Sequence, residues 1–262
     1  MQSLTNVAVS ALSRLKRNPI EYKRHLLSAA AVTAFVGMGV GTDLTLIGRD
    51  VIRVLLGPAW EPAGRIFTFF GPGIGVMFIY SISSWIHLSI GRADRWFRWT
   101  IVELAVTGLL FVLGLPWGPA GVAVAWTASF WILTIPALWY AGKPMHLGIG
   151  PVLAAVWKYF LASLLSGCVT AVITGQLQPF VPASSWVGAL ARIAVVSSFF
   201  GVLYIGAVVV LYRGCAPLYQ VARLLRDMVP WPGSQEPRPA TLAACGPGIS
   251  EALSLAGKER AK

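Results

Sequence analysis

Residues 187–212 read VGALARIAVVSSFFGVLYIGAVVVLY, and Arg192 is the only charged residue among them. A helix that crosses the hydrocarbon core of a bilayer needs ~20 consecutive, mainly apolar residues. A helix in the core of a soluble protein carries polar residues on its outer face, and this stretch has no such face. The segment therefore predicts a transmembrane helix.

Similar apolar stretches occur along most of the chain. The other five cover about 26–47 (with the helix extending to about 56), 66–88, 101–115, 120–140 and 151–173. Of the 262 residues, 56% are apolar and 12% are charged, and the mean hydropathy is +0.69. A soluble fold of this length has too little interior for so many apolar side chains, which excludes a cytosolic globular enzyme. We expect an all-α, polytopic membrane bundle of six transmembrane helices over residues 26–213.

The two ends of the chain differ from this bundle. Residues 1–25 mix basic and apolar side chains, as in a cytoplasmic segment that lies on the membrane surface. Residues 214–228 predict a short amphipathic helix next to the membrane. Residues 229–262 are rich in Pro, Gly, Ala and Ser, and we expect a disordered cytoplasmic tail.

The basic residues indicate the orientation. They gather before the first stretch, between the second and third, between the fourth and fifth and after the sixth, whereas 116–119 and 174–186 hold none. Cytoplasmic connections carry the excess of Lys and Arg, so both termini should be cytoplasmic. The net charge of +11 is then topological and predicts no nucleic-acid partner. Arg49, Arg53 and Arg65 depart from the pattern because they lie at the outer side.

No catalytic or metal-binding pattern is present. The three cysteines show no C-x-x-C spacing, and the three histidines show no H-x-x-x-H spacing. We therefore expect a protein that is not an enzyme and uses no metal or other cofactor.

Two glycine-dense segments lie inside apolar stretches, at 37–41 (GMGVG) and 71–75 (GPGIG). Glycines four residues apart let two helices approach closely in a membrane. At Gly71 and Pro72 we also expect a break or kink, because proline removes a backbone donor. Broken helices mark binding regions in many transporters, although a kink can also serve packing alone.

Ionisable residues within the apolar stretches are the candidate functional residues, because charge at membrane depth is costly. Glu103 lies in the third stretch and Asp43 in the first. Arg49 and Arg53 extend the first stretch on one helical face, and Arg192 lies inside the sixth. They predict a polar cavity whose cations face an anionic substrate. The alternative for the arginines is that they reach the outer interface with their long side chains.

Four segments carry a resemblance to a known family: ALSRL at 11–15 with YKR at 22–24, VLLGPAW at 54–60, LSIGRADR at 88–95 and GLPWGPAGVA at 114–123. In order and spacing they resemble the C-terminal half of the polysaccharide (O-antigen and exopolysaccharide) flippases of the multidrug/oligosaccharidyl-lipid/polysaccharide exporter superfamily. The similarity covers roughly residues 10–175. It is closest to members that export lipid-linked exopolysaccharide or lipopolysaccharide units.

The resemblance implies a protein of the bacterial inner (plasma) membrane that moves a polyprenyl-diphosphate-linked oligosaccharide across it. Substrate would contact Arg49, Arg53 and Arg192, and Glu103 or Asp43 would couple transport to an ion. Family members have two six-helix halves, and this chain resembles one. We therefore expect a second half-transporter or self-association, besides contact with membrane lipids. A truncated gene, a mis-assigned start, a non-transporting scaffold in the same pathway and a small-solute carrier remain alternatives.

Overall fold

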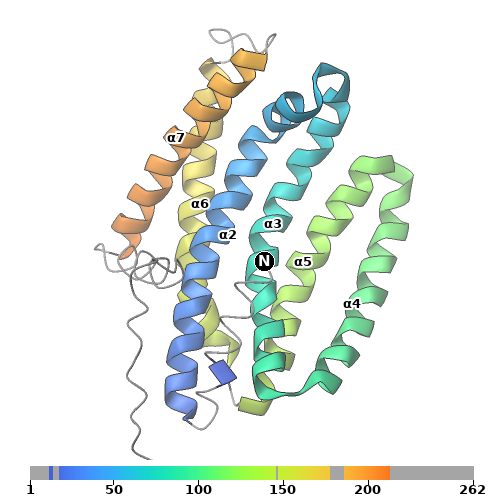
Figure 1. Cartoon of the computed structure of the whole chain (residues 1–262), viewed down its shortest axis with the longest axis vertical. Coiled ribbons are helices and arrows are strands. Elements are labelled where there is room, and N and C mark those ends of the chain that lie inside the picture. Colours follow the sequence, from blue (N-terminus) through green and yellow to red (C-terminus); the bar gives the residue numbers. More distant parts are fainter. Residues whose placement is uncertain (1–11, 14–17, 146, 178–185, 213–262) are drawn as a thin grey trace, which may run out of the picture. The chain divides into compact units, whose positions relative to one another are not determined.

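The computed structural model describes residues 12–13, 18–145, 147–177 and 186–212. Six long helices and three short 3-10 turns account for nearly all of this part of the chain, and no strand occurs in it (Figure 1). The helices are α2 (Pro19–Leu56), α3 (Glu61–Ile90), α4 (Ala93–Gly114), α5 (Gly118–Gly142), α6 (Ile149–Leu177) and α7 (Trp186–Tyr212); the turns are η1 (Pro58–Trp60), η2 (Leu115–Trp117) and η3 (Lys143–Met145).

The helices are long and apolar enough for a membrane protein, which confirms the all-α membrane bundle. Five continuous stretches meet the length and hydropathy of a membrane span, and one of them, Ala93–Met145, contains both α4 and α5. The number of six spans therefore stays a prediction. The segments predicted at 214–228 and 229–262, and most of 1–25, lie outside the described residues.

Helix α2 begins at Pro19, before the apolar stretch that starts at about residue 26, because its N-terminus is capped. The Asn18 side chain accepts a hydrogen bond from the backbone N–H of Glu21 at 3.4 Å, and Pro19 occupies the first turn, where its missing N–H costs nothing. Residues 19–25 of the predicted surface segment thus continue directly into the first span. At the other end of the next helix, Gly91 adopts a φ of 76°, a left-handed conformation that ends α3 before α4 reverses direction.

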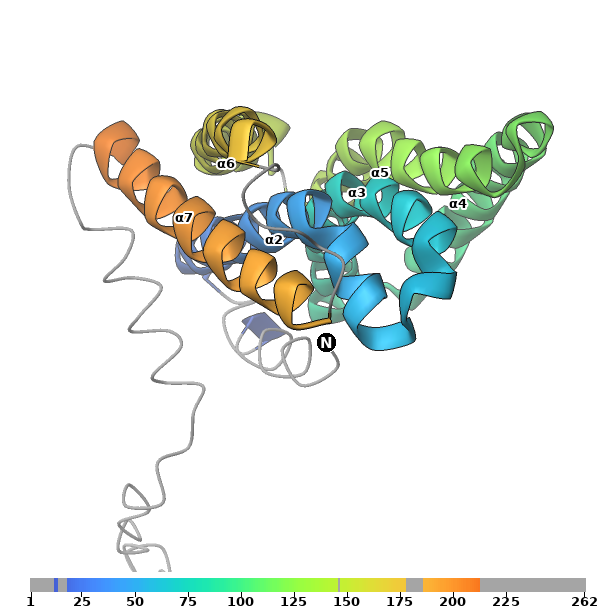
Figure 2. The same ribbon diagram turned by 90° about the horizontal axis from the view of Figure 1, so that it is seen from above.

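Helix α2 is the centre of the arrangement. It packs along α3 on one side and against α6 and α7 on the other, and α5 packs on α3 with α4 beyond it. Figure 2 shows the same order, with α6 and α7 on one side of α2 and the α4–α5 pair on the far side of α3. The buried core therefore lies mainly between α2, α3, α6 and α7.

The glycine segments bring α2 and α3 into backbone contact. A Cβ atom placed on Gly41 would lie 2.6 Å from the backbone nitrogen of Gly75 and 2.7 Å from the carbonyl oxygen of Gly71. A Cβ on Gly37 would meet the Gly75 carbonyl at 3.0 Å. These positions admit no side chain, so the close packing expected from the glycine spacing is present.

Helix α3 continues through Pro72 without interruption, so no break occurs there. A kink at Gly71 and Pro72 stays a prediction. Proline cannot donate to the preceding turn and crowds its carbonyls. The carbonyl that loses its helical donor is that of Thr68, four residues before Pro72. The neighbouring Phe69 carbonyl accepts a hydrogen bond from the Thr127 hydroxyl of α5 at 2.6 Å. This hydrogen bond joins α5 to the turn of α3 that precedes Pro72.

Candidate functional site

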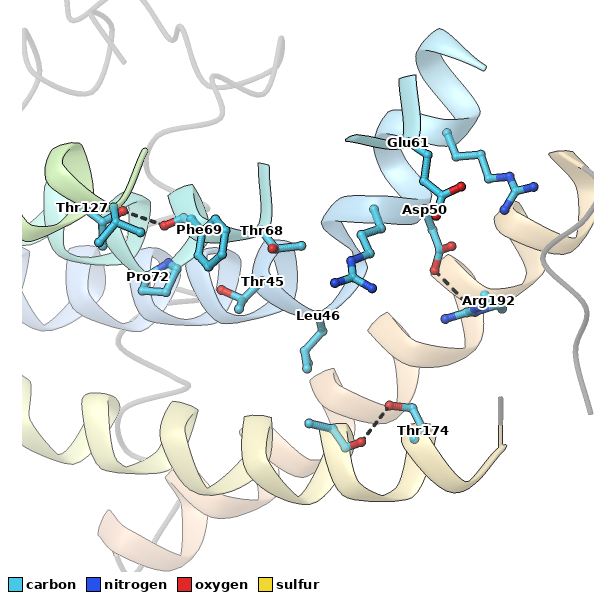
Figure 3. Close-up of a pocket in the computed structure, with 15 residues that line it drawn as sticks. Thr45, Leu46, Asp50, Glu61, Thr68, Phe69, Pro72, Thr127, Thr174 and Arg192 are labelled. Atoms are coloured by element: carbon cyan, nitrogen blue, oxygen red, sulfur yellow. Dashed lines mark hydrogen bonds and ion pairs between the residues drawn. The ribbon is translucent and has the colours of Figure 1, made fainter. Parts of the chain in front are cut away.

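A polar cavity of 710 Å³ lies at one end of the bundle. Its walls come from the last turns of α2 and α6 and the first turns of α3, α5 and α7 (Figure 3). These ends meet because successive helices run in alternating directions. The lining residues are Thr45, Leu46, Arg49, Asp50, Arg53, Glu61, Thr68, Phe69, Pro72, Val124, Thr127, Ala171, Thr174, Gly175 and Arg192.

Three of the arginines singled out from the sequence line this one cavity: Arg49, Arg53 and Arg192. Arg49 and Arg53 lie four residues apart on α2, so their side chains leave the same helical face. Neither forms an ion pair with any residue in the described part of the chain. Their guanidinium groups are therefore available to a ligand.

Arg192 differs from these two arginines because it forms an ion pair with Asp50. Its Nε lies 3.4 Å from the Asp50 Oδ2, and Figure 3 shows the two side chains meeting across α7 and α2. Asp50 is buried, with 7% of its surface exposed, whereas the Arg192 side chain keeps 27%. Arg192 is the only charged residue of α7, so this pair is the electrostatic link between the two helices.

The fifth charged group of the cavity, Glu61, belongs to a separate surface pair. Its Oε1 lies 3.4 Å from Nη2 of Arg65, one turn along α3, and both side chains are more than half exposed. Such a pair contributes little to stability. The Glu61 carboxylate is nevertheless taken by Arg65, so among the described residues Arg49 and Arg53 are the charges of the cavity without an ion-pair partner.

Threonine hydroxyls form much of the remaining polar wall. Thr45 donates to the Gly41 carbonyl at 2.8 Å, and Thr174 donates to the Thr170 carbonyl at 2.7 Å. A hydroxyl that donates to its own helix still offers lone pairs to a ligand. The cavity thus presents guanidinium donors for an anion and threonine acceptors for hydroxyl groups.

Asp43 does not line the cavity. It lies two turns before Arg49 on α2 and accepts a hydrogen bond from the Ser197 hydroxyl of α7 at 3.0 Å. Its second oxygen, Oδ1, is buried, and no hydrogen-bond partner for it exists among the described residues. A carboxyl group in that setting needs a proton or a cation to offset the lost hydration.

Glu103 lies elsewhere again, between α4 and α3. The Tyr80 hydroxyl donates to Glu103 Oε2 at 2.7 Å, and the indole N–H of Trp99 donates to the same tyrosine oxygen at 2.8 Å. The structure therefore groups the predicted site residues as follows: the three arginines and Pro72 around the cavity, Gly71 at the α2 contact, and the two carboxylates at separate places.

Sequence reasoning missed the partners of these residues. It did not identify Asp50 as the partner of Arg192, and it assigned no role to Thr127, Tyr80 or Ser197. One signal was available for the first pair: Arg192 is the only charged residue of its apolar helix, so an acidic partner for it had to come from another helix. For the other three residues the sequence holds no comparable signal, since Thr, Tyr and Ser are tolerated throughout membrane helices.

Fold and site together define a helical membrane protein with a cationic cavity at one end of its bundle. Residues 1–65 match a family model described as "Polysaccharide biosynthesis protein". The matched segment includes all of α2, with Arg49 and Arg53, and supports a role in polysaccharide biosynthesis. Neither the curated proteins nor the solved structures gave a significant match.

Proposed function

We propose that this chain translocates a polyprenyl-diphosphate-linked oligosaccharide for surface polysaccharide biosynthesis, as one half of a two-lobed transporter. The observation that carries the proposal is the gathering of Arg49, Arg53 and Arg192 around one cavity between five helices. Guanidinium groups hold phosphate oxygens through paired, charge-assisted hydrogen bonds. The family match over residues 1–65 supports the proposal at a coarser level, because it indicates a role in polysaccharide biosynthesis.

The proposed orientation places the cavity at the outer side of the bacterial inner membrane, with both termini in the cytoplasm. Arg49 and Arg53 would then receive the diphosphate at the end of its crossing. The process is alternating access without covalent chemistry, so we assign no catalytic residue and no cofactor. The sugar units would contact the threonine hydroxyls and the solvent at the cavity mouth.

Coupling to an ion is assigned to Asp43 rather than equally to Asp43 and Glu103. The buried Oδ1 of Asp43 has no hydrogen-bond partner in the described region, and its other oxygen bridges α2 to α7 through Ser197. Binding or loss of a proton or sodium ion there would change the contact between two helices that also line the cavity. Glu103 is held by Tyr80 at a distance from that cavity and is the weaker candidate.

The test is a double substitution, Arg49→Lys with Arg53→Lys, in a strain whose polymer export depends on this protein. Lysine keeps the charge and the long stem but lacks the planar fork that matches a diphosphate. We expect polymer export to fall by about tenfold or more, equivalent to ~1.4 kcal/mol of lost binding, with normal membrane abundance.

Arg65→Lys is the matched control, because Arg65 lies at the same end of the bundle, is exposed and does not line the cavity. It should leave export unchanged. Normal export in the double variant would assign Arg49 and Arg53 to the lipid interface and remove the basis of the proposal. It would then favour a scaffold that binds partners in the same pathway.

A further inference from the structure

A second hollow, of 340 Å³, adjoins the cationic cavity. It lies between α2, α3, α5 and α6, and four residues line both: Thr45, Leu46, Pro72 and Ala171. The two spaces therefore lie next to each other along these four residues. We call the second space the apolar groove.

The groove differs from the cavity in its chemistry. None of the described residues that line it is an acid, a base or a histidine. The hydroxyl of Ser163 donates to the Phe160 carbonyl at 2.8 Å, and Thr45 likewise donates to its own helix, so neither needs a ligand. The lining is Met38, Gly41, Thr42, Thr45, Leu46, Pro72, Gly75, Trp131, Phe160, Ser163, Leu164, Gly167, Cys168 and Ala171.

The groove runs along the bundle from the cavity toward the middle of the helices. On α6 it extends from Ala171 to Phe160, which is ~16 Å at 1.5 Å per residue. Helices α5 and α6 make few contacts with each other. Trp131 of α5 and Phe160 of α6 meet edge to face, with ring centroids 5.5 Å apart. Trp131 is 44% exposed and Leu164 49% exposed, so the groove has a rim that faces the lipid.

We infer that this groove binds the hydrocarbon chain of the polyprenyl diphosphate whose head group binds at Arg49 and Arg53. The inference rests on the proposed function and adds the site for the chain. A free anion would need the cavity alone, whereas an amphiphile needs a cationic space with an apolar one beside it, which is the arrangement here. A single groove fits a carrier with one chain better than a glycerophospholipid with two.

The test uses a geranylgeranyl diphosphate that carries a diazirine at the far end of its chain. The full-length protein is photolabelled in phosphatidylcholine nanodiscs, and the labelled residues are mapped by mass spectrometry. Cys168→Trp places a large side chain at the groove, while Val169→Trp, at the next and similarly exposed position of α6, lies outside it. We expect labels on α5 and α6 along the groove, a loss of about tenfold in Cys168→Trp and none in Val169→Trp.

The arms of the experiment separate the possible ligands. Excess inorganic pyrophosphate should suppress the labelling, because it occupies the arginines, and phosphatidylglycerol should not. Equal labelling of Cys168→Trp and the parent overturns the inference, as does suppression by phosphatidylglycerol, which would make the groove a site for ordinary phospholipid. Export that still depends on Arg49 and Arg53 would in either case leave the proposed function standing.

Discussion

Four of the five charged residues that line the cavity, all but Glu61, fall into two groups with different consequences. Asp50 and Arg192 face each other from α2 and α7 and neutralise one another. Arg49 and Arg53 have no such partner in the described part of the chain and keep their charge for a ligand. Because both also lie near enough to Asp50 to interact with it electrostatically, the ion pair tempers the repulsion among three arginines in one space.

This arrangement predicts an asymmetric response to breaking the pair. Arg192→Ala leaves the buried Asp50 carboxylate without its partner, and we expect it to destabilise the protein by about 2–3 kcal/mol. Asp50→Asn should cost less, since Arg192 is partly exposed and can turn toward water or lipid phosphates. The measurement is the midpoint of thermal unfolding of the purified chain in detergent.

The double variant, Asp50→Asn with Arg192→Gln, provides the control. It removes both charges while keeping two polar side chains of similar shape, so it should recover most of the stability lost in Arg192→Ala. The single variant Arg192→Gln completes the comparison: if the double variant loses as much stability as Asp50→Asn and Arg192→Gln summed, the two residues act independently.

The sequence could identify candidate site residues only where the membrane makes a side chain costly. The cost of charge at membrane depth singled out Arg49, Arg53 and Arg192, and the structure places all three at one cavity. The same argument could not separate them from Asp43 and Glu103. Neither carboxylate lines the cavity, because that depends on the rotation of each helix and on its neighbours, and the local sequence pattern encodes neither of these.

At the scale of the helices, apolar length predicted where spans occur but not where helices end. Helix α4 begins at Ala93 although its apolar stretch begins at about 101, because 93–100 carry arginines and tryptophans suited to the membrane interface. Backbone hydrogen bonding continues through such residues until a residue such as Gly91 or Gly57 ends it. Hydropathy measures the transfer of side chains into lipid. It does not indicate how far the helical hydrogen bonding continues beyond the apolar stretch.

The contact between α2 and α3 yields a prediction at this scale. Gly41→Ala would place a methyl group within 2.6 Å of the Gly75 backbone, which cannot move aside as a flexible side chain can. We expect a destabilisation of about 1–3 kcal/mol, as for other overpacked sites, and lower export because the cavity walls shift apart. Thermal unfolding in detergent and export in cells are the two measurements.

Gly108→Ala on α4 is the matched control for that experiment. A Cβ at Gly108 would meet no other atom within 4 Å, so the change should leave export unaltered. Alanine also favours helix over glycine, and a small gain in stability is expected. Equal losses in the two variants would mean that the α2–α3 contact is not the sensitive feature.

At the scale of the whole described bundle, several helices have apolar faces that nothing in the described region covers. Leu104 and Val112 of α4 are 73% and 62% exposed, and Val202 and Val210 of α7 are each 72% exposed. Lipid can cover such faces, so they do not by themselves require a partner. We expect a partner for another reason: the exporters that the chain resembles have two six-helix halves, and this chain resembles one of them.

The last prediction is therefore that the chain works as part of a pair, with a second copy or with a separate half-transporter. Cross-linking in native membranes should give a dimer-sized or larger species at ordinary expression levels. An unrelated polytopic protein of equal abundance should give none under the same conditions, which excludes random collision. If the isolated monomer, reconstituted at less than one chain per vesicle, still transports the lipid-linked sugar, a single six-helix half is sufficient. The cavity at Arg49 and Arg53 would then have to hold its substrate against the lipid without a second wall.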